Sequence, residues 1–96
     1  MVDTSHIPAK QELCDGLIHR TFSHDVDPNE LKWHWDEADR TVTVLNESDW
    51  YYQADNELPI KLSQGKIISI KAGDWHRVIK GQTNLEIMIK EKTPEN

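Results

Sequence analysis

Two histidines and one aspartate carry the strongest chemical signal in this sequence. His34 and Asp36 are separated by a single residue, and His76 follows much later in the chain. Side chains alternate along a β-strand, so His34 and Asp36 face the same way wherever this stretch is extended. Two neutral imidazoles and one carboxylate can hold one face of a divalent Fe, Mn, Ni or Zn ion and leave other positions open for a substrate. We therefore predict that His34, Asp36 and His76 converge and bind a metal.

Arg40 supports a second interpretation of the same cluster. A guanidinium beside a divalent cation is unfavourable unless a carboxylate or a substrate anion lies between them. Arg40 could instead pair with Asp36 inside the protein and offer its remaining donors to a carboxylate or phosphate group of a ligand. A third interpretation is a purely structural polar core. All three interpretations remain open from the sequence.

Two further residues are candidates for ligand binding. Gln53 could line a pocket, although a cross-strand hydrogen bond explains it equally well. Trp75 precedes His76 and could cover the mouth of a site, or it could pack at a subunit interface. No catalytic residue can be assigned from the sequence.

Short β-strands must position these residues. Between Arg40 and Leu45, threonine alternates with valine, which is typical of a strand with one apolar face. If the bend at residues 37–39 leaves the parity unchanged, Arg40 and the valines lie inside with His34 and Asp36, and Trp33 and Trp35 lie outside. We find no repeat or convincing helix, and we expect strands at residues 13–24, 31–36, 40–45, 50–53, 58–62, 66–70, 75–79 and 85–89. This spacing predicts an all-β sandwich or barrel.

The stretch from Gly65 to His76 resembles the second sequence motif of the cupins. That motif runs Gly, five residues, Pro, any residue, Gly, two residues, His. Here Gly65, Gly73 and His76 occupy the matching places, and Lys71 takes the place of the proline. The asparagine expected four residues after the histidine is Lys80.

The first cupin motif is matched less completely. His34 matches its first histidine, Asp36 replaces its second, and Arg40 stands in place of a metal-binding glutamate. Both glycines of that motif are replaced, by Pro28 and Glu47. The resemblance covers roughly residues 16–90 and is greatest to small uncharacterised cupins encoded by phages of marine bacteria. It implies a single small jelly-roll barrel (a double-stranded β-helix) whose mouth holds a metal or a small molecule, often in a dimer.

Composition limits the partners and the domain organisation. The 96 residues fit one domain, which we place at residues 13–91, between a flexible arm (1–12) and a polar tail (92–96). The formal charge of −6 argues against nucleic acid or an anionic membrane as a partner. No apolar run approaches the roughly 20 residues that span a bilayer. The polar N-terminus and the lone Cys14 lead us to expect a cytoplasmic protein.

These features lead to hypotheses in three function classes. The first is a metal-dependent isomerase, oxygenase or lyase acting on a carbohydrate or a small acid. The alternative is a metal-free module that binds or senses a small anionic molecule without turnover. A third is a phage or host accessory protein that acts only through protein contacts. The outward tryptophans Trp33 and Trp35, and the edge near Trp50, also predict a homodimer.

Overall fold

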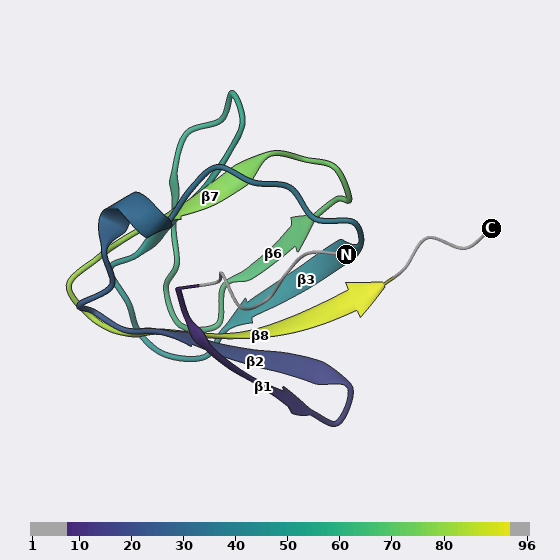
Figure 1. Ribbon diagram of the computed structural model, residues 1–96, viewed down its shortest axis with the longest axis horizontal. Helices are drawn as coiled ribbons and strands as arrows, with labels where there is room; N and C mark the ends of the chain where they lie inside the picture. Colours follow the sequence, from purple (N-terminus) through teal and green to yellow (C-terminus); the bar gives the residue numbers. More distant parts are fainter. Residues whose placement is uncertain (1–7, 93–96) are drawn as a thin grey trace.

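Two antiparallel β-sheets form the protein (Figure 1). The computed structural model describes residues 8–92. Within them lie β1 (Lys10–Cys14), β2 (Leu17–Phe22), the 3-10 helix η2 (Pro28–Glu30), β3 (Asp39–Val44), β4 (Tyr51–Ala54), β5 (Ile60–Lys61), β6 (Ile67–Ile70), β7 (His76–Ile79) and β8 (Leu85–Lys92). The strand order is β1-β2-β8-β3-β6 in one sheet and β5-β4-β7 in the other. No helix in this part of the chain is long and apolar enough to cross a membrane.

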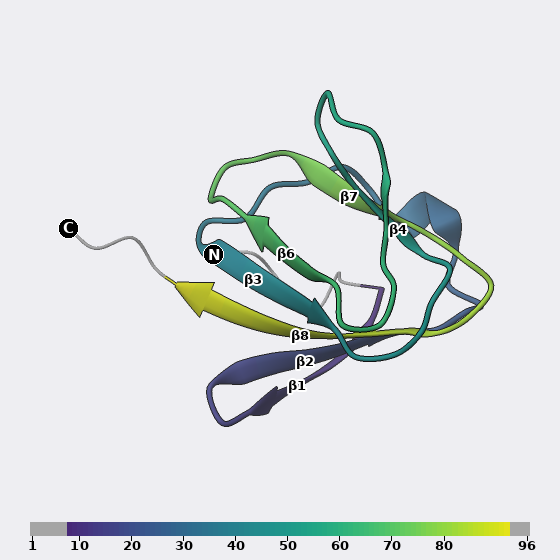
Figure 2. The ribbon, with the colours of Figure 1, turned by 180° about the vertical axis from the view of Figure 1, so that it is seen from behind.

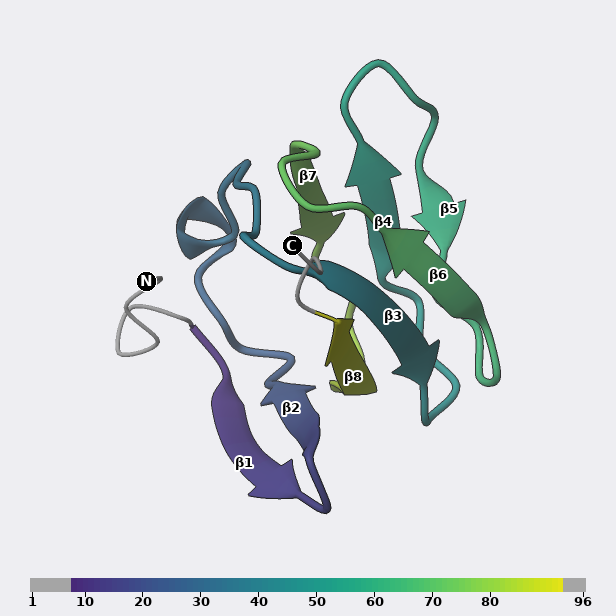
Figure 3. The same cartoon turned by 90° about the vertical axis from the view of Figure 1, so that its right-hand side faces the viewer.

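The hydrophobic core lies between the two sheets. The larger sheet curves from β1 to β6, and the smaller sheet lies across from it (Figures 2 and 3). Val42 and Val44 point inward from β3, as the alternation predicts, and the valines are joined by buried residues from most other strands. The buried apolar residues are Phe22, Ala38, Val42, Val44, Trp50, Tyr52, Leu62, Ile68, Ile70, Leu85, Ile87 and Ile89. The predicted all-β fold, a small jelly roll, is confirmed.

The N-terminal part of the sheet differs from the prediction. Residues 13–24 form parts of two strands rather than one kinked strand, because Asp15 and Gly16 make a tight turn with φ of 50° and 80°. Cys14 pairs with Leu17 across this turn, which is the two-residue hairpin that an Asp-Gly pair favours. Residues 10–12, expected in the flexible arm, belong to β1. Residues 1–7 of that arm and 93–96 of the tail lie outside the described residues.

The strand expected at residues 31–36 is also wrong. This segment is a loop that makes an isolated antiparallel bridge between His34 and His76. The backbone amide of each histidine donates to the carbonyl of the other, at 3.0 and 2.9 Å. A third bond, from Gly73 N to Asp36 O, is 2.9 Å long. Three backbone bonds therefore hold the loop extended and keep His34 and Asp36 on the same side, as predicted.

Trp50 lies inside the protein rather than at a surface edge. It is 0% exposed, its indole N–H donates to the carbonyl of Thr83, and its ring centroid lies 5.4 Å from that of Phe22. A buried aromatic ring of this size stabilises the folded state mainly through its apolar area, and its N–H needs the partner it has. Trp50 itself therefore has no surface to offer a partner, and the exposed residues of this edge are Tyr51 and Ile60, at 39% and 41%.

Candidate metal centre

The predicted convergence of His34, Asp36 and His76 is confirmed. One ligand atom from each of the three residues lies within 4.8 Å of the others. Asp36 and His76 are each 4% exposed, whereas His34 is accessible to solvent. His34 and Asp36 come from the loop before β3, and His76 begins β7. The isolated bridge between His34 and His76 is therefore the element that brings the distant histidine to the His-x-Asp pair.

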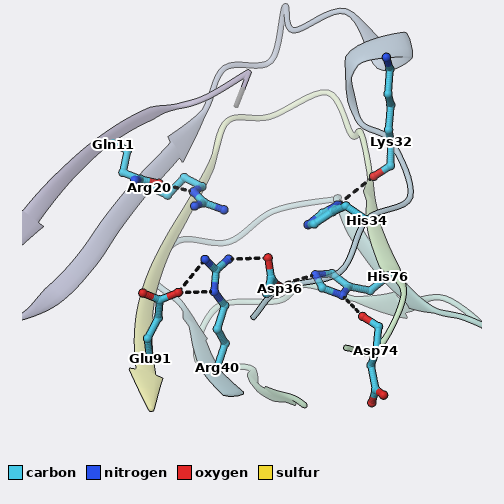
Figure 4. A network of polar contacts seen from close by, with 9 residues as sticks. All are labelled: Gln11, Arg20, Lys32, His34, Asp36, Arg40, Asp74, His76 and Glu91. Atoms are coloured by element: carbon cyan, nitrogen blue, oxygen red, sulfur yellow. Dashed lines mark hydrogen bonds and ion pairs between the residues drawn. The ribbon is translucent and has the colours of Figure 1, made fainter. Parts of the chain in front are cut away.

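Both histidine rings are oriented by a hydrogen bond to the backbone carbonyl two residues earlier. The Nδ1 atom of His34 lies 2.9 Å from the carbonyl oxygen of Lys32, and Nδ1 of His76 lies 2.8 Å from that of Asp74 (Figure 4). A carbonyl oxygen can only accept, so Nδ1 carries the hydrogen in each ring. In the neutral ring the lone pair is then on Nε2. Metal-binding histidines are commonly fixed in this way by a carbonyl or a carboxylate on the other ring nitrogen.

Asp36 presents an unsatisfied oxygen to this cluster. Its Oδ1 lies 3.3 Å from Nη1 of Arg40. Its Oδ2 is buried and lies 3.2 Å from Nε2 of His76, but no described residue gives this oxygen a properly directed hydrogen bond. Lone pairs on Nε2 and Oδ2 repel each other at this distance, so a cation is needed between them, either a proton or a metal ion. Two imidazoles and one carboxylate, whose buried oxygen lacks a partner among the described residues, fit a divalent transition metal.

The charges around Asp36 keep it ionised. Burial alone raises the pKa of this carboxyl, but the contact with His76 and the positive charge of Arg40 outweigh burial and leave the pKa below its ordinary value. The pKa of His34 is lowered as well, because partial desolvation of its ring outweighs the bond to the carbonyl of Lys32. An ionised carboxylate and a neutral imidazole are the forms that bind metal.

Arg40 pairs with Asp36, as one interpretation of the sequence predicted. It also contacts Glu91 on β8, through Nε at 2.9 Å and Nη2 at 2.8 Å (Figure 4). Both ends of the guanidinium are thus engaged by carboxylates, and the side chain is 13% exposed. Arg40 balances the charge of Asp36 and has few donors left for a ligand.

A cavity of about 290 Å³ opens beside the cluster. His34, Asp36, Arg40 and His76 line its polar part. Its apolar floor includes Phe22, Val42, Leu62, Ile68, Ile70, Leu85, Ile87 and Ile89. A polar cluster on an apolar floor is typical of sites for small molecules, and this volume is near the lower end of their range of roughly 300–1,000 Å³.

Arg20 also lines the cavity, and sequence reasoning missed it. It lies on β2 and is 7% exposed. Burial, and then the charge of Arg40, lower its pKa to about 10. Arg20 and Phe22 are two residues apart on β2, so their side chains face the same way, and the apolar Phe22 indicates the inner face. This inference was not made because the hairpin turn at Asp15 and Gly16 was not recognised, and β2 was therefore not identified as a separate strand.

Gln53 and Trp75 do not line the cavity. Gln53 lies on the side of β4 opposite to Tyr52 and accepts two hydrogen bonds from Arg77, at 3.0 and 2.8 Å. Trp75 is 49% exposed. Trp35, which was expected to face away from the site, does line the cavity, while remaining 46% exposed. It lies on a loop rather than in a regular strand, so strict alternation does not fix its side chain.

Comparison with known proteins identifies the fold. No family model matches the sequence, and no curated protein does. Solved structures do match. An RmlC-like cupin family protein from Methanocaldococcus jannaschii, described as a double-stranded β-helix, superposes with a TM-score of 0.69 over 98% of this chain and 87% of its own, at 10% identity. This chain has the cupin fold.

Two other similar structures carry functional names. A putative mannose-6-phosphate isomerase from Ralstonia eutropha gives a TM-score of 0.63 at 18% identity, over 90% of this chain and 83% of that one. A structure named FeII HppE gives 0.61 at 12% identity, over 96% of this chain and 59% of that one. At identities this low, the superpositions show a shared fold only. The functional names apply to those two proteins.

Proposed function

We propose that this cupin-fold protein binds a divalent metal through His34, Asp36 and His76 and acts on a small anionic molecule held in the cavity. The observation that carries this proposal is the buried Oδ2 of Asp36, which faces Nε2 of His76 with no hydrogen-bond partner among the described residues. The reaction classes that suit the site are isomerisation, oxygenation and lyase chemistry on a carbohydrate or a small acid.

Each residue has a distinct role in this proposal. The two histidines and Asp36 would hold Fe, Mn, Ni or Zn, and a bound ion would polarise an oxygen of the ligand or supply redox chemistry. Arg40 keeps Asp36 ionised and in place. The apolar floor would hold the carbon skeleton of the ligand and exclude water. The names of the two functional neighbours, an iron(II) form and a sugar-phosphate isomerase, are consistent with such chemistry on this fold.

A metal-free binding or sensing module is the alternative. Arg40 already balances the charge of Asp36 at 3.3 Å, so the cluster does not require an ion for neutrality. In that case a proton on Nε2 of His76 would satisfy Oδ2 of Asp36.

The proposal also covers the assembly, the location, the domain bounds and the relatives of the protein. We propose a homodimer in the cytoplasm and a relationship to the small cupins of phages of marine bacteria. We also propose a single domain, whose predicted bounds of 13–91 are widened to 10–92 by β1 and β8. Three exposed tryptophans support the dimer: Trp33, Trp35 and Trp75 are 39%, 46% and 49% exposed. Exposed aromatic clusters commonly mark interfaces.

Metal binding tests the proposal directly. Protein purified without an affinity tag should bind Mn(II) or Fe(II) at one ion per chain, measured by elemental analysis and by calorimetric titration. Asp36→Asn removes the only carboxylate of the triad and should weaken Mn(II) binding by about 100-fold or more, since even outer partners of metal ligands contribute about 10–100-fold.

His19→Gln provides the matched control. His19 lies between Glu12 and Glu86 on the surface, away from the triad, and its replacement should leave Mn(II) affinity unchanged. Absence of binding for Mn, Fe, Ni and Zn in the wild-type protein would remove the metal centre and favour the sensing module. Equal affinity in Asp36→Asn would show that any metal binds elsewhere.

A further inference from the structure

Arg20 differs from Arg40 in its partners. Its Nε donates to Oε1 of Gln11 at 2.7 Å, which fixes the guanidinium from one side. Within residues 8–92, neither Nη atom has a hydrogen-bond or ion-pair partner. Figure 4 shows this end directed away from Gln11, toward the space bounded by His34, Asp36 and Arg40. Arg20 therefore presents two paired donors to the cavity.

Among residues 8–92, no carboxylate makes a direct contact with the guanidinium of Arg20. At neutral pH its guanidinium is protonated even with a pKa of about 10. The carboxylates whose charges act on it, Asp36 and Glu91, are both in contact with Arg40. Burying a cation without an anionic partner destabilises the folded protein. A bound anion would remove this cost.

We propose that Arg20 binds the oxyanion group of a small organic molecule, a carboxylate or a phosphate, whose other end reaches the His34, Asp36 and His76 cluster. A guanidinium edge with two parallel donors matches two oxygens of either group. The apolar floor between β2, β3 and β8 accommodates the carbon portion of the ligand. This inference rests on the cavity being the ligand site proposed above, but it does not depend on the metal.

A structural role for Arg20 is the competing explanation. The bond to Gln11 joins β1 to β2, where Gln11 and Arg20 are also paired in register. If this bond is the purpose of Arg20, an apolar replacement destabilises the protein. If Arg20 is retained for a ligand, replacement by methionine of similar length should raise the unfolding temperature in anion-free buffer, because an unbalanced buried charge is removed.

Anion binding without metal provides the test. Malonate and inorganic phosphate would each be titrated into wild-type protein in a zwitterionic buffer with EDTA, followed by calorimetry and by thermal unfolding. We expect at least one probe to bind and to raise the unfolding temperature. Arg20→Met should weaken binding by about tenfold or more, as expected for the loss of a charge-assisted bidentate contact. Arg77→Met, which removes the same charge outside the cavity, should bind as wild type does.

The outcomes separate the alternatives. Preference for malonate identifies a carboxylate ligand, and preference for phosphate identifies a phosphorylated one. Failure of both probes to bind the wild type overturns the inference, as does equal affinity in Arg20→Met or a lower unfolding temperature of that variant without anion. If Arg20→Met does not fold, Arg20→Lys decides, because it keeps the charge and loses the paired donors. Mn(II) binding is measured separately, so a failed metal centre and a failed Arg20 site are distinguishable.

Discussion

At the scale of single residues, most polar groups around the cavity already have a partner within the described residues. Nδ1 of His34 and of His76 is held by a carbonyl two residues earlier, and Arg40 is held between Asp36 and Glu91. These contacts fix the polar groups around the centre. What remains is the histidine Nε2 atoms, Oδ2 of Asp36 and the Nη end of Arg20. These contacts support both proposals, a metal ion at the His34, Asp36 and His76 cluster and an anionic group at Arg20.

Replacing Arg40 by glutamate tests this division of charge. Arg40→Glu restores a carboxylate where the cupin motif has one and places it beside Asp36 and Glu91. Without metal, the three carboxylates repel one another, so the unfolding temperature in EDTA should fall below that of wild type. Mn(II) should bind more tightly than to wild type, by about tenfold or more, because a fourth oxygen ligand is added and a competing cation removed.

Arg40→Gln separates these two effects. Arg40→Gln removes the positive charge without adding a carboxylate. If only Arg40→Glu gains Mn(II) affinity, the new glutamate is itself a ligand of the ion. Calorimetric titration and thermal unfolding of both variants give the result. Unchanged Mn(II) affinity in Arg40→Glu would mean that position 40 cannot reach the ion.

At the scale of elements, the sequence predicted the strands from β3 to β8 well and the segments before β3 poorly. Val42 and Val44 could be placed inside because β3 strictly alternates. The loop at residues 31–36 kept the parity of a strand because its bridge with His76 holds it extended, so the facing of His34 and Asp36 was predictable. Arg20 was missed because its orientation follows from a turn conformation at Asp15 and Gly16. Gln53 and Trp75 were misplaced because alternation cannot say which side of a strand faces the cavity.

The side chain of Asp49 holds the loop between β7 and β8 through hydrogen bonds that we call the Asp49 clamp. Asp49 accepts backbone hydrogen bonds from Gln82 and Thr83, at 2.9 and 3.1 Å. A Cβ at Gly81 would lie 2.6 Å from the backbone carbonyl carbon of Asp49, so only glycine permits this approach. The amide donors of Gln82 and then Thr83 hold the pKa of Asp49 below its ordinary value of 3.8.

The stability from this clamp should therefore depend on pH in a defined direction. Because the folded-state pKa of Asp49 is lowered, its contribution is complete above the unfolded value of 3.8 and is lost as pH falls through the folded value. Asp49→Asn should lower the unfolding temperature at pH 7, and its difference from wild type should shrink below about pH 4. Thermal unfolding from pH 7 to pH 3 measures this. A difference that stays constant over that range would contradict the role of the charge.

At the scale of the whole molecule, one region of the surface is unusually aromatic. The bridge between His34 and His76 places Trp35 beside Trp75 in register, and the Arg77 guanidinium carbon lies 4.7 Å from the centroid of the Trp33 ring. Trp33 and Trp35 flank His34 on the loop before β3, and Trp75 directly precedes His76, the first residue of β7. Trp35 also lines the cavity, so a partner on this surface would lie close to the cavity opening.

Self-association through this surface is the last prediction. A second copy would bury three rings that are 39–49% exposed, and aromatic residues contribute strongly to interface stability because they bury a large area with little loss of side-chain entropy. The wild-type protein should sediment as a dimer at micromolar concentration, and Trp75→Lys should shift it to monomer by placing a charge in the apolar contact. Leu13→Lys, at a position 75% exposed on β1 in the other sheet, should remain dimeric. A wild-type monomer under these conditions, or a Trp75→Lys variant that stays dimeric, would show that this aromatic surface does not hold two copies together.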